Sequence, residues 1–303
     1  DPFSVISIAE SRALSKKHSD PTYLFYENLR GFNFRTLGHL YSSTPMLKYS
    51  QYPAGQKTDG KGSIDIMKNI QNLEEYTISS SPDTIYNHSA GVYASHMIVH
   101  DIFSKSYENY TYNYIDNFFN ERHVDSFGSK PIFPLANVLP INPAGDDIAD
   151  HPAKQYLQPT TGKSFDNSVQ DNSFQTPFTP HNPQKSMQIR NAHMQMMNTA
   201  LQVNIDVLGT TVIAAGDIVE CNIPFSGTYT TTQNEVFDRL YKGRFLIKAI
   251  RHDFNPAENQ HTMSMNLCKD NFLEPLEAPE ENYEPKSKRS KGTVTETWDD
   301  VGV

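Results

Sequence analysis

Two histidines, His96 and His100, stand four residues apart, a spacing that on a helix would suit a metal ion. Zinc protease motifs place a glutamate directly after the first histidine, whereas Met97 follows here. The surrounding alternation predicts a strand, which separates the two imidazoles by roughly 13 Å at about 3.3 Å per residue. We therefore expect both histidines to be structural.

Two further sets of side chains could bind a cation. His181 and His193 flank a polar segment and a methionine-rich helix, but no cysteine or second carboxylate cluster stands near them at ligand spacing. Asp146, Asp147 and Asp150 lack the glycine and the terminal glutamate of a calcium loop. We expect a polar loop there, and no metal site in the chain.

Catalytic motifs are missing from the sequence. It contains no nucleophile elbow, no P-loop and no dinucleotide fingerprint. Paired carboxylates for sugar hydrolysis depend on spatial rather than sequence spacing, and the early candidates are Glu74, Glu75 and Glu121. Nothing singles these three out, so we predict no catalytic residues, no cofactor and no enzymatic activity.

Composition narrows the class of protein. The chain has 303 residues, of which 37% are hydrophobic and 11% aromatic, with 16 Tyr and 17 Phe against one Trp. Its formal net charge of −9 argues against nucleic-acid binding through a broad basic face. No apolar run approaches the roughly 20 residues that a membrane span needs. Cys221 and Cys268 are expected to be reduced core residues, as in a protein that assembles in a cytosol.

Periodicity and turn residues predict a series of short elements in the first half. Residues 3–17 have helical spacing, and two aromatic runs, 23–26 and 31–35, read as a hairpin closed at Gly31. Thr36 can cap the short helix that follows. Further elements are helices at 64–70 and 84–88, a strand at 91–101 and a strand-rich stretch at 106–118. Tyr107, Tyr110, Tyr112 and Tyr114 are expected to share one face of this stretch.

The composition and periodicity of the second half of the chain change twice along its length. Residues 128–186 carry nine prolines among polar residues and are predicted to be an irregular arm or linker. A helix follows at 186–200, and its methionines suit either an adaptable partner-binding face or an ordinary core: Met187, Met194, Met196 and Met197. Residues 201–270 alternate with period two and predict barrel-like strands.

The sequence thus predicts a β-rich α+β protein in four parts. These are residues 1–127, the irregular arm 128–186, a strand domain 187–273, and a charged flexible tail 274–303. Because the chain starts at Asp1 and enters helix-like sequence at once, we expect it to be the later part of a longer protein.

Three groups of residues resemble one protein family. Residues 25–37 read FYENLRGFNFRTL, similar to a FYEN-x-RGF-x-F segment. Residues 91–95, His100-Asp101 and 112–114 are similar to a strand pair. The late series is GD-x-V at 216, G-x-F-L-I at 243, RH-x-F at 251 and HT-x-x-M at 261. In this order they resemble the baseplate hub proteins of contractile-tailed bacteriophages of the T-even-like and cyanophage-like groups, covering about three quarters of the chain.

This resemblance implies a fold and a role. Hub proteins of this family have tail-tube-like β-barrel domains and form a homotrimeric ring. The ring receives the tail tube on one side and the central spike or lysozyme protein on the other, within the virion. DNA passes through such a ring without specific binding. The resemblance also implies that the N-terminal part of such a protein, including much of its first tube domain, is missing from this sequence.

The resemblance also implies contacts between subunits. We expect them in the tyrosine run and in the late strands, with these interface residues: Tyr107, Tyr110, Tyr112, Tyr114, Phe245, Ile247, Met263 and Met265. Two other classes of protein stay open from the sequence: a carbohydrate-binding tail or spike module, in which aromatic rings stack on sugars, and a cell-wall hydrolase.

Overall fold

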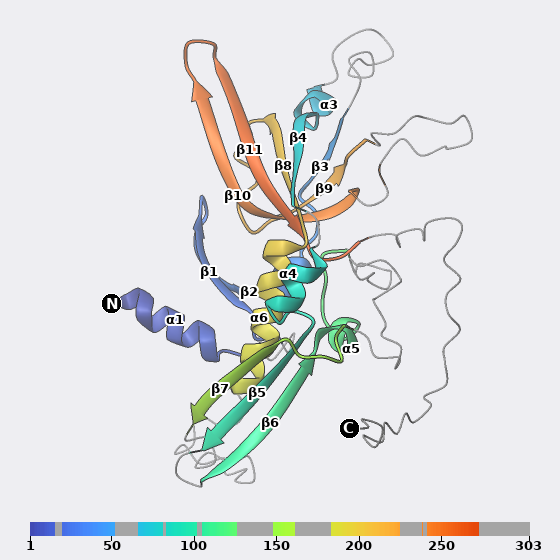
Figure 1. The fold of residues 1–303 in the computed structure, drawn as a ribbon. Coiled ribbons are helices and arrows are strands. Elements are labelled where there is room, and N and C mark those ends of the chain that lie inside the picture. Colours follow the sequence, from blue (N-terminus) through green and yellow to red (C-terminus); the bar gives the residue numbers. More distant parts are fainter. Residues whose placement is uncertain are drawn as a thin grey trace, which may run out of the picture.

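Six strands from both halves of the chain form one curled sheet in the computed structural model, which describes residues 1–15, 20–51, 66–80, 83–101, 105–125, 148–160, 183–224, 238 and 241–272. The spatial order is β3-β9-β10-β11-β8-β4. Its strands are β3 (Leu47–Ser50), β4 (Leu73–Ser80), β8 (Leu201–Leu208), β9 (Ile218–Asn222), β10 (Gly243–Asn255) and β11 (Gln260–Lys269). Figure 1 shows this sheet in the upper part of the molecule.

The curled sheet brings its two edge strands together at one end. Ser50 at the end of β3 forms an isolated parallel bridge with Asn72, directly before β4, and the Ser50 N–H donates to the Gln71 carbonyl at 3.0 Å. Only β3 and β9 run parallel within the sheet, while the other neighbours are antiparallel. The curl therefore encloses one face of the sheet.

The enclosed face is the larger hydrophobic core of the chain. In β8, buried residues alternate with less buried ones from Leu201 to Leu208, as expected for a strand with one covered face. The core combines these with residues from the other strands, among them Tyr49, Leu73, Val219, Phe245, Ile247, Met263 and Met265. The predicted alternation of the late strands is thus what fills this core.

A second, three-stranded sheet lies at the other end of the molecule (Figure 1). Its order is β6-β5-β7, with β5 (Ala94–Asp101) in the centre, β6 (Ser106–Asn113) antiparallel and β7 (Lys154–Thr160) parallel to it. Helix α6 (Pro183–Thr199) packs on this sheet through Ala192 and Met196, and Ala200, directly after the helix, joins the same core. The short helices are α2 (Leu37–Tyr41), α3 (Ile66–Ile70), α4 (Thr84–Ser89) and α5 (Tyr114–Phe118).

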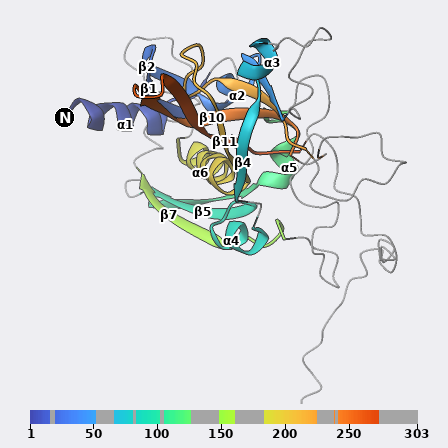
Figure 2. The ribbon, with the colours of Figure 1, turned by 90° about the horizontal axis from the view of Figure 1, so that it is seen from above.

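The N-terminal elements lie on the opposite side of α6 from α4, as Figure 2 shows. They are α1 (Pro2–Arg12) and the hairpin of β1 (Tyr23–Asn28) and β2 (Gly31–Thr36). The predicted hairpin is confirmed, and Thr36 caps α2 as expected, accepting from the His39 N–H at 3.2 Å. A third cluster of buried residues joins α2, Met197, Ile218, Leu246 and Cys268 beneath this hairpin.

Several expectations need correction. The curled sheet takes β3 and β4 from residues 1–127, so it does not stop at the boundary expected at residue 187. Strand β7 lies inside the stretch predicted to be irregular, and its Pro159 is tolerated because β7 is an edge strand. Residues 114–118 form helix α5 rather than strand. The expected tail, 274–303, and most of the arm lie outside the described residues.

Candidate functional site

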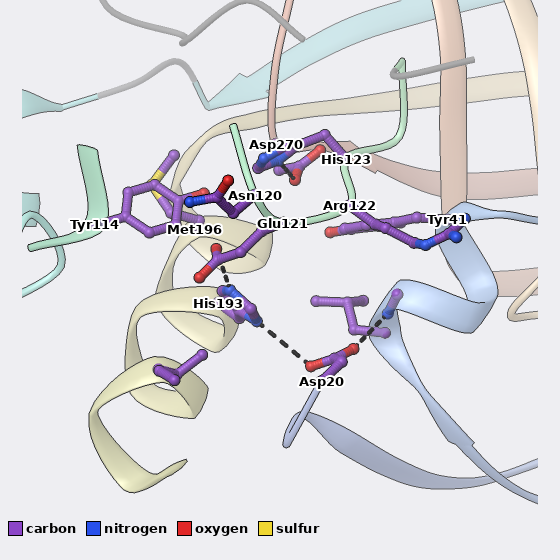
Figure 3. Close-up of a pocket in the computed structure, with 13 residues that line it drawn as sticks. Asp20, Tyr41, Tyr114, Asn120, Glu121, Arg122, His123, His193, Met196 and Asp270 are labelled. Atoms are coloured by element: carbon purple, nitrogen blue, oxygen red, sulfur yellow. Dashed lines mark hydrogen bonds and ion pairs between the residues drawn. The ribbon is translucent and has the colours of Figure 1, made fainter. Parts of the chain in front are cut away.

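A pocket of about 90 Å³ lies between α2, α5 and α6, and several charged side chains line it (Figure 3). Asp20 enters from the segment before β1, Glu121 from the turn after α5, and His193 from α6. Further charged or polar lining residues are Asn120, Arg122, His123 and Asp270. The volume is enough for a few water molecules.

His193 lies between two carboxylates. Its Nε2 is 2.6 Å from Glu121 Oε2, while Nδ1 is 2.9 Å from the Thr22 hydroxyl and 3.6 Å from Asp20 Oδ1. Burial alone would lower the pKa of His193, but the contacts with Asp20 and Glu121 outweigh it and raise the pKa from 6.5 to about 10. The ring is therefore an imidazolium at neutral pH.

The carboxylates of Asp20 and Glu121 are held in place by further hydrogen-bond donors. Asp20 accepts from the backbone N–H groups of Thr22 and Gly38 at 2.8 and 2.6 Å. Burial alone would raise the pKa of Asp20, yet His193 and these backbone donors lower it. Glu121 also accepts the Tyr112 hydroxyl at 2.9 Å. Thr22, α2, β6 and α6 are thus joined through one triad, which we call the junction triad: Asp20, Glu121 and His193.

A second buried pair continues from the junction triad toward the curled sheet. His123 is buried, with Nδ1 2.8 Å from Asp270 Oδ2 and Nε2 2.7 Å from the Phe118 carbonyl. The other oxygen of Asp270 accepts from the Val124 N–H at 3.1 Å. Asp270 follows directly on β11, so this contact connects the curled sheet to the turn after α5.

Lys269 and Asp125 form a third buried contact beside this pair. The ammonium group pairs with Asp125 and donates to the Lys242 carbonyl at 2.8 Å, and it lies 5.3 Å from the centre of the Phe245 ring. Burial lowers the pKa of Lys269 more than Asp125 raises it. These interactions bind elements to each other, and the cationic His193 is a poor proton acceptor for general base catalysis near neutral pH.

The hairpin makes a separate contact with the turn before β9, 187 residues away along the chain. Arg30 donates to both oxygens of Asp217, at 2.9 and 2.7 Å, and Asn28 Nδ2 donates to the Ala215 carbonyl at 2.9 Å. Arg30 also donates to the Val212 carbonyl at 2.8 Å. We call these interactions the hairpin contact. They join the FYEN-x-RGF segment directly to the GD-x-V segment.

The two faces of the hairpin differ. Leu24 and Tyr26 pack against the buried cluster beneath it. The other face carries aromatic rings that stack in cross-strand pairs: Tyr23 on Phe34 at 4.8 Å and Phe25 on Phe32 at 5.8 Å between ring centres. Phe32 is 67% exposed and Phe34 43%. We call this second side the aromatic face.

Most of the predicted interface residues lie inside the described fold. Phe245, Ile247, Met263 and Met265 belong to the core of the curled sheet. Tyr112 and Tyr114 belong to the core beneath α6, and Tyr110 is partly buried on β6. Tyr107 is 71% exposed. The four tyrosines do not share one face, because Tyr107 precedes Tyr110 by an odd number of residues and side chains alternate along a strand.

The predicted metal and catalytic candidates are dispersed. His96 and His100 lie on strand β5, as expected, and His181 and residues 146–147 lie outside the described part of the chain. Among the described residues, no three His, Cys, Asp or Glu side chains gather so as to hold a metal ion. Of the three glutamates, Glu121 joins the junction triad, whereas Glu74 and Glu75 lie on β4.

Sequence reasoning missed the junction triad, since Asp20 and His193 carry no local motif.

The other candidates from the sequence lie mostly in the core. Met196 and Met197 are core residues, whereas Met187 is partly exposed. Both cysteines are free and buried, as predicted, and burial raises the pKa of each thiol. No helix within the described residues is long and apolar enough to cross a membrane.

Comparisons with known proteins do not show a family for this chain. No protein-family model matches the chain, and no curated protein matches it. One solved structure with similarity to the chain is that of the tail protein from Neisseria meningitidis MC58, at 12% sequence identity and a TM-score of 0.32. The similarity covers 76% of this chain and 46% of that chain, so this chain spans less than half of that protein's length.

Proposed function

We propose that this chain is a structural subunit of a phage tail baseplate hub. In this role it forms a trimeric ring that joins the tail tube to the central spike or lysozyme protein. The observation that carries the proposal is the hairpin contact. Two of the segments that resemble hub proteins, far apart in sequence, bind each other through Arg30, Asn28 and Asp217. The contact supports the proposal because it places the two segments in one structural unit.

The fold is compatible with an assembly role. The curled sheet is a candidate for the tube-like barrel implied by the resemblance, with β3 and β4 as edges that neighbouring subunits could continue. The hairpin contact fixes an element whose outer side is aromatic and exposed. Buried polar contacts that hold elements rigidly, such as the junction triad, suit a subunit whose surface must match its neighbours.

The proposal names partners and a place. The partners are two further copies of the chain, the tail tube protein, the spike protein and other baseplate proteins, within the virion tail after assembly in the host cytoplasm. The net charge of −9 would let DNA slide through the ring without adhering to it.

Analytical ultracentrifugation of the full chain, alone and mixed with the spike protein of the same phage, tests the proposal. We expect a trimer that captures spike chains. A chain that stays monomeric at micromolar concentration and ignores the spike would contradict a hub role.

A carbohydrate-binding module is the second candidate, because the aromatic face exposes two phenylalanines. Sugars stack on free ring faces, whereas these rings stack on one another at interplanar angles of 21° and 10°. We therefore rank this function below assembly. Binding of the isolated chain to a glycan array, lost on changing Phe32→Ala, would reverse the order.

We also propose that the chain is not a hydrolase. Glu121, the early candidate that lies in the pocket, accepts a hydrogen bond from the Tyr112 hydroxyl and contacts the cationic His193. Peptidoglycan incubated with the full chain should stay intact. Cleavage that the Glu121→Gln variant abolishes would establish the hydrolase instead.

A further inference from the structure

We infer that Lys269 and Asp125 form a covalent cross-link, an amide between the lysine Nζ and the aspartate Cγ that is made with loss of one water molecule. The two residues come from different parts of the fold, since Lys269 ends strand β11 and Asp125 lies after helix α5. The folded chain makes this bond by itself. The inference goes beyond the proposed function and does not depend on it.

The two side chains are buried and in direct contact. The side chain of Lys269 is 0% exposed and that of Asp125 is 2% exposed. The nitrogen touches Asp125 Oδ2, yet Oδ2 accepts no hydrogen bond of normal angle from any described residue. Buried ion pairs are ordinarily joined by well-directed hydrogen bonds. This contact instead places the nitrogen against the carboxyl group, within reach of its carbon, as reacting atoms about 3–3.5 Å apart require.

Hydrogen bonds hold both reacting groups in this position. The other carboxyl oxygen, Asp125 Oδ1, accepts from the Arg244 N–H at 2.9 Å. The backbone of Asp125 is fixed as well, because its N–H donates to Asn271 Oδ1 at 3.1 Å. On the lysine side, Nζ of Lys269 donates to the Lys242 carbonyl at 2.8 Å. The start of β10 and the end of β11 therefore orient the amine and the carboxyl group toward each other.

Gly243 leaves the space in which the two groups meet. Its φ is +114°, and a Cβ there would lie 2.8 Å from Asp125 Oδ2 and 3.1 Å from Lys269 Nζ. A side chain at this position would therefore push the carboxyl group and the amine apart. On another side, the ring of Phe245 lies 5.3 Å from Nζ and belongs to the core of the curled sheet. The surroundings thus exclude water, which is the product of the condensation.

The reaction needs only the two side chains. Burial lowers the pKa of Lys269, so the ammonium group gives a proton to the carboxylate and leaves an amine beside a carboxylic acid. The amine nitrogen attacks Cγ, and the negative charge that develops on Oδ1 is stabilised by the Arg244 N–H. Oδ2 then leaves as water, with the acid proton and one proton from the nitrogen. One C–N bond forms, one C–O bond breaks, and no oxidant or other reactant is consumed.

Two physical effects favour the amide over the ion pair at this place. Well-oriented groups within one molecule react as if at effective concentrations of roughly 10⁵–10⁸ M, which a free amine and a free acid in water never reach. The amide also replaces two buried charges by one neutral group, which costs less free energy to keep away from water. The product ties the end of the curled sheet to the segment that follows α5.

Mass spectrometry of the full chain tests the cross-link. We expect the intact mass to be lower than the mass of the sequence by one water molecule. Trypsin under denaturing conditions should leave the bond after Lys269 uncut and should release the peptide that begins at His123 joined to the peptide that contains Lys269. A mass that equals the sequence after prolonged incubation at neutral pH would overturn the inference. A loss of water that maps to any other position would overturn it as well.

Three variants, followed by intact mass during cell-free synthesis, test the role of the geometry. Lys269→Arg should show no loss of water, because a guanidinium group stays protonated. Gly243→Ala should cross-link at least about tenfold more slowly than the wild type, because the added Cβ displaces the carboxyl group. Gly31→Ala is the matched control, since its φ of +110° gives similar backbone strain with no atom within 4 Å, and it should cross-link at the wild-type rate. A loss of water that persists in Lys269→Arg would contradict the inference, and the wild-type mass decides the question even where a variant fails to fold.

Discussion

His193 is the residue on which three elements converge. Its ring contacts Glu121 after α5, Thr22 before β1 and, at 3.6 Å, Asp20. A buried cation between two carboxylates is stabilising only while all members are present, because removing one leaves uncompensated charge in a poorly solvated place. The fold therefore depends on this histidine more than its position on the polar-looking helix α6 would indicate.

Replacing His193→Gln should lower the free energy of unfolding by about 3 kcal/mol, since the two carboxylates then lose their shared cation. Urea denaturation at pH 7 measures the change. His100→Gln is the control, because His100 is exposed on β5 and should change stability by less than about 0.5 kcal/mol. Equal stabilities for the two variants would show that the junction triad contributes nothing.

The same histidine should make stability depend on pH. Its folded pKa of about 10 lies above the ordinary 6.5, so the folded state holds the proton more tightly than the unfolded state. Its contribution is complete below about pH 6.5 and is lost as the pH rises through about 10, by at most about 1.4 kcal/mol per pH unit. Asp20 acts in the opposite sense, because its lowered pKa gives stability that is lost only as the pH falls below its ordinary 3.8.

Unfolding free energies of the wild type and of His193→Gln, measured from pH 6 to pH 10, check this pH dependence. The difference between the two proteins should shrink toward pH 10. A difference that stays constant over this range would mean that the imidazolium is not what stabilises the wild type.

At the level of residues, the sequence predicts burial better than it predicts partners. The alternation of Phe245, Ile247, Met263 and Met265 correctly indicates strands, but the same apolar residues suit a core and an interface equally. The junction triad could not be predicted, because its members are up to 173 residues apart in the chain, between Asp20 and His193. Only the folded chain brings them together.

The hairpin contact shows why a glycine is needed at a single position of the turn before β9. Gly216 has a φ of +92°, and a Cβ there would lie 2.2 Å from the Tyr26 hydroxyl oxygen. Gly31 has a φ of +110° but no atom within 4 Å of the added carbon. The two positions therefore share backbone strain, whereas steric overlap with the hairpin occurs only at Gly216.

Gly31→Ala should cost about 1–2 kcal/mol through strain alone. Gly216→Ala should cost at least about 1 kcal/mol more and should detach the hairpin, with faster hydrogen exchange at the amides of β1 and β2. Mass spectrometry of the exchange reports the hairpin directly. If both variants lose the same stability and keep the hairpin protected, Tyr26 does not pack against this turn as described.

At the level of elements, the predictions succeed where local chemistry decides. The hairpin, the cap at Thr36, strand β5, helix α6 and strand β8 all follow from spacing and turn residues. Strand β7 is not predicted from the sequence because prolines and polar residues surround it, and its strand partner among the described residues is β5. An edge strand with Pro159 has little local signal of its own.

At the level of the whole molecule, the three-stranded sheet is inserted in the sequence between strands of the curled sheet. Strands β3 and β4 precede the three-stranded sheet, yet they pair with β9 and β8, which follow it. Such pairing joins residues as far apart as Leu47 and Val219, and period-two alternation carries no information about it. The expected division into successive domains therefore could not anticipate a sheet that is interrupted by another sheet.

Several buried contacts link the two sheets, and Asp270 provides one of them through His123 and the Val124 N–H. Asp270→Asn keeps the shape but removes the charge that His123 faces, so the three-stranded sheet should open independently of the curled sheet. We expect amides of β5 and β6 to exchange at least about tenfold faster, which corresponds to about 1.4 kcal/mol, while those of β10 and β11 keep their protection. Asp206→Asn is the matched control, because Asp206 bonds to Ser264 within the curled sheet. Uniform acceleration in both sheets of the Asp270 variant would instead mean that the chain opens as one cooperative unit, since local opening spares the rest of a protein and global unfolding does not.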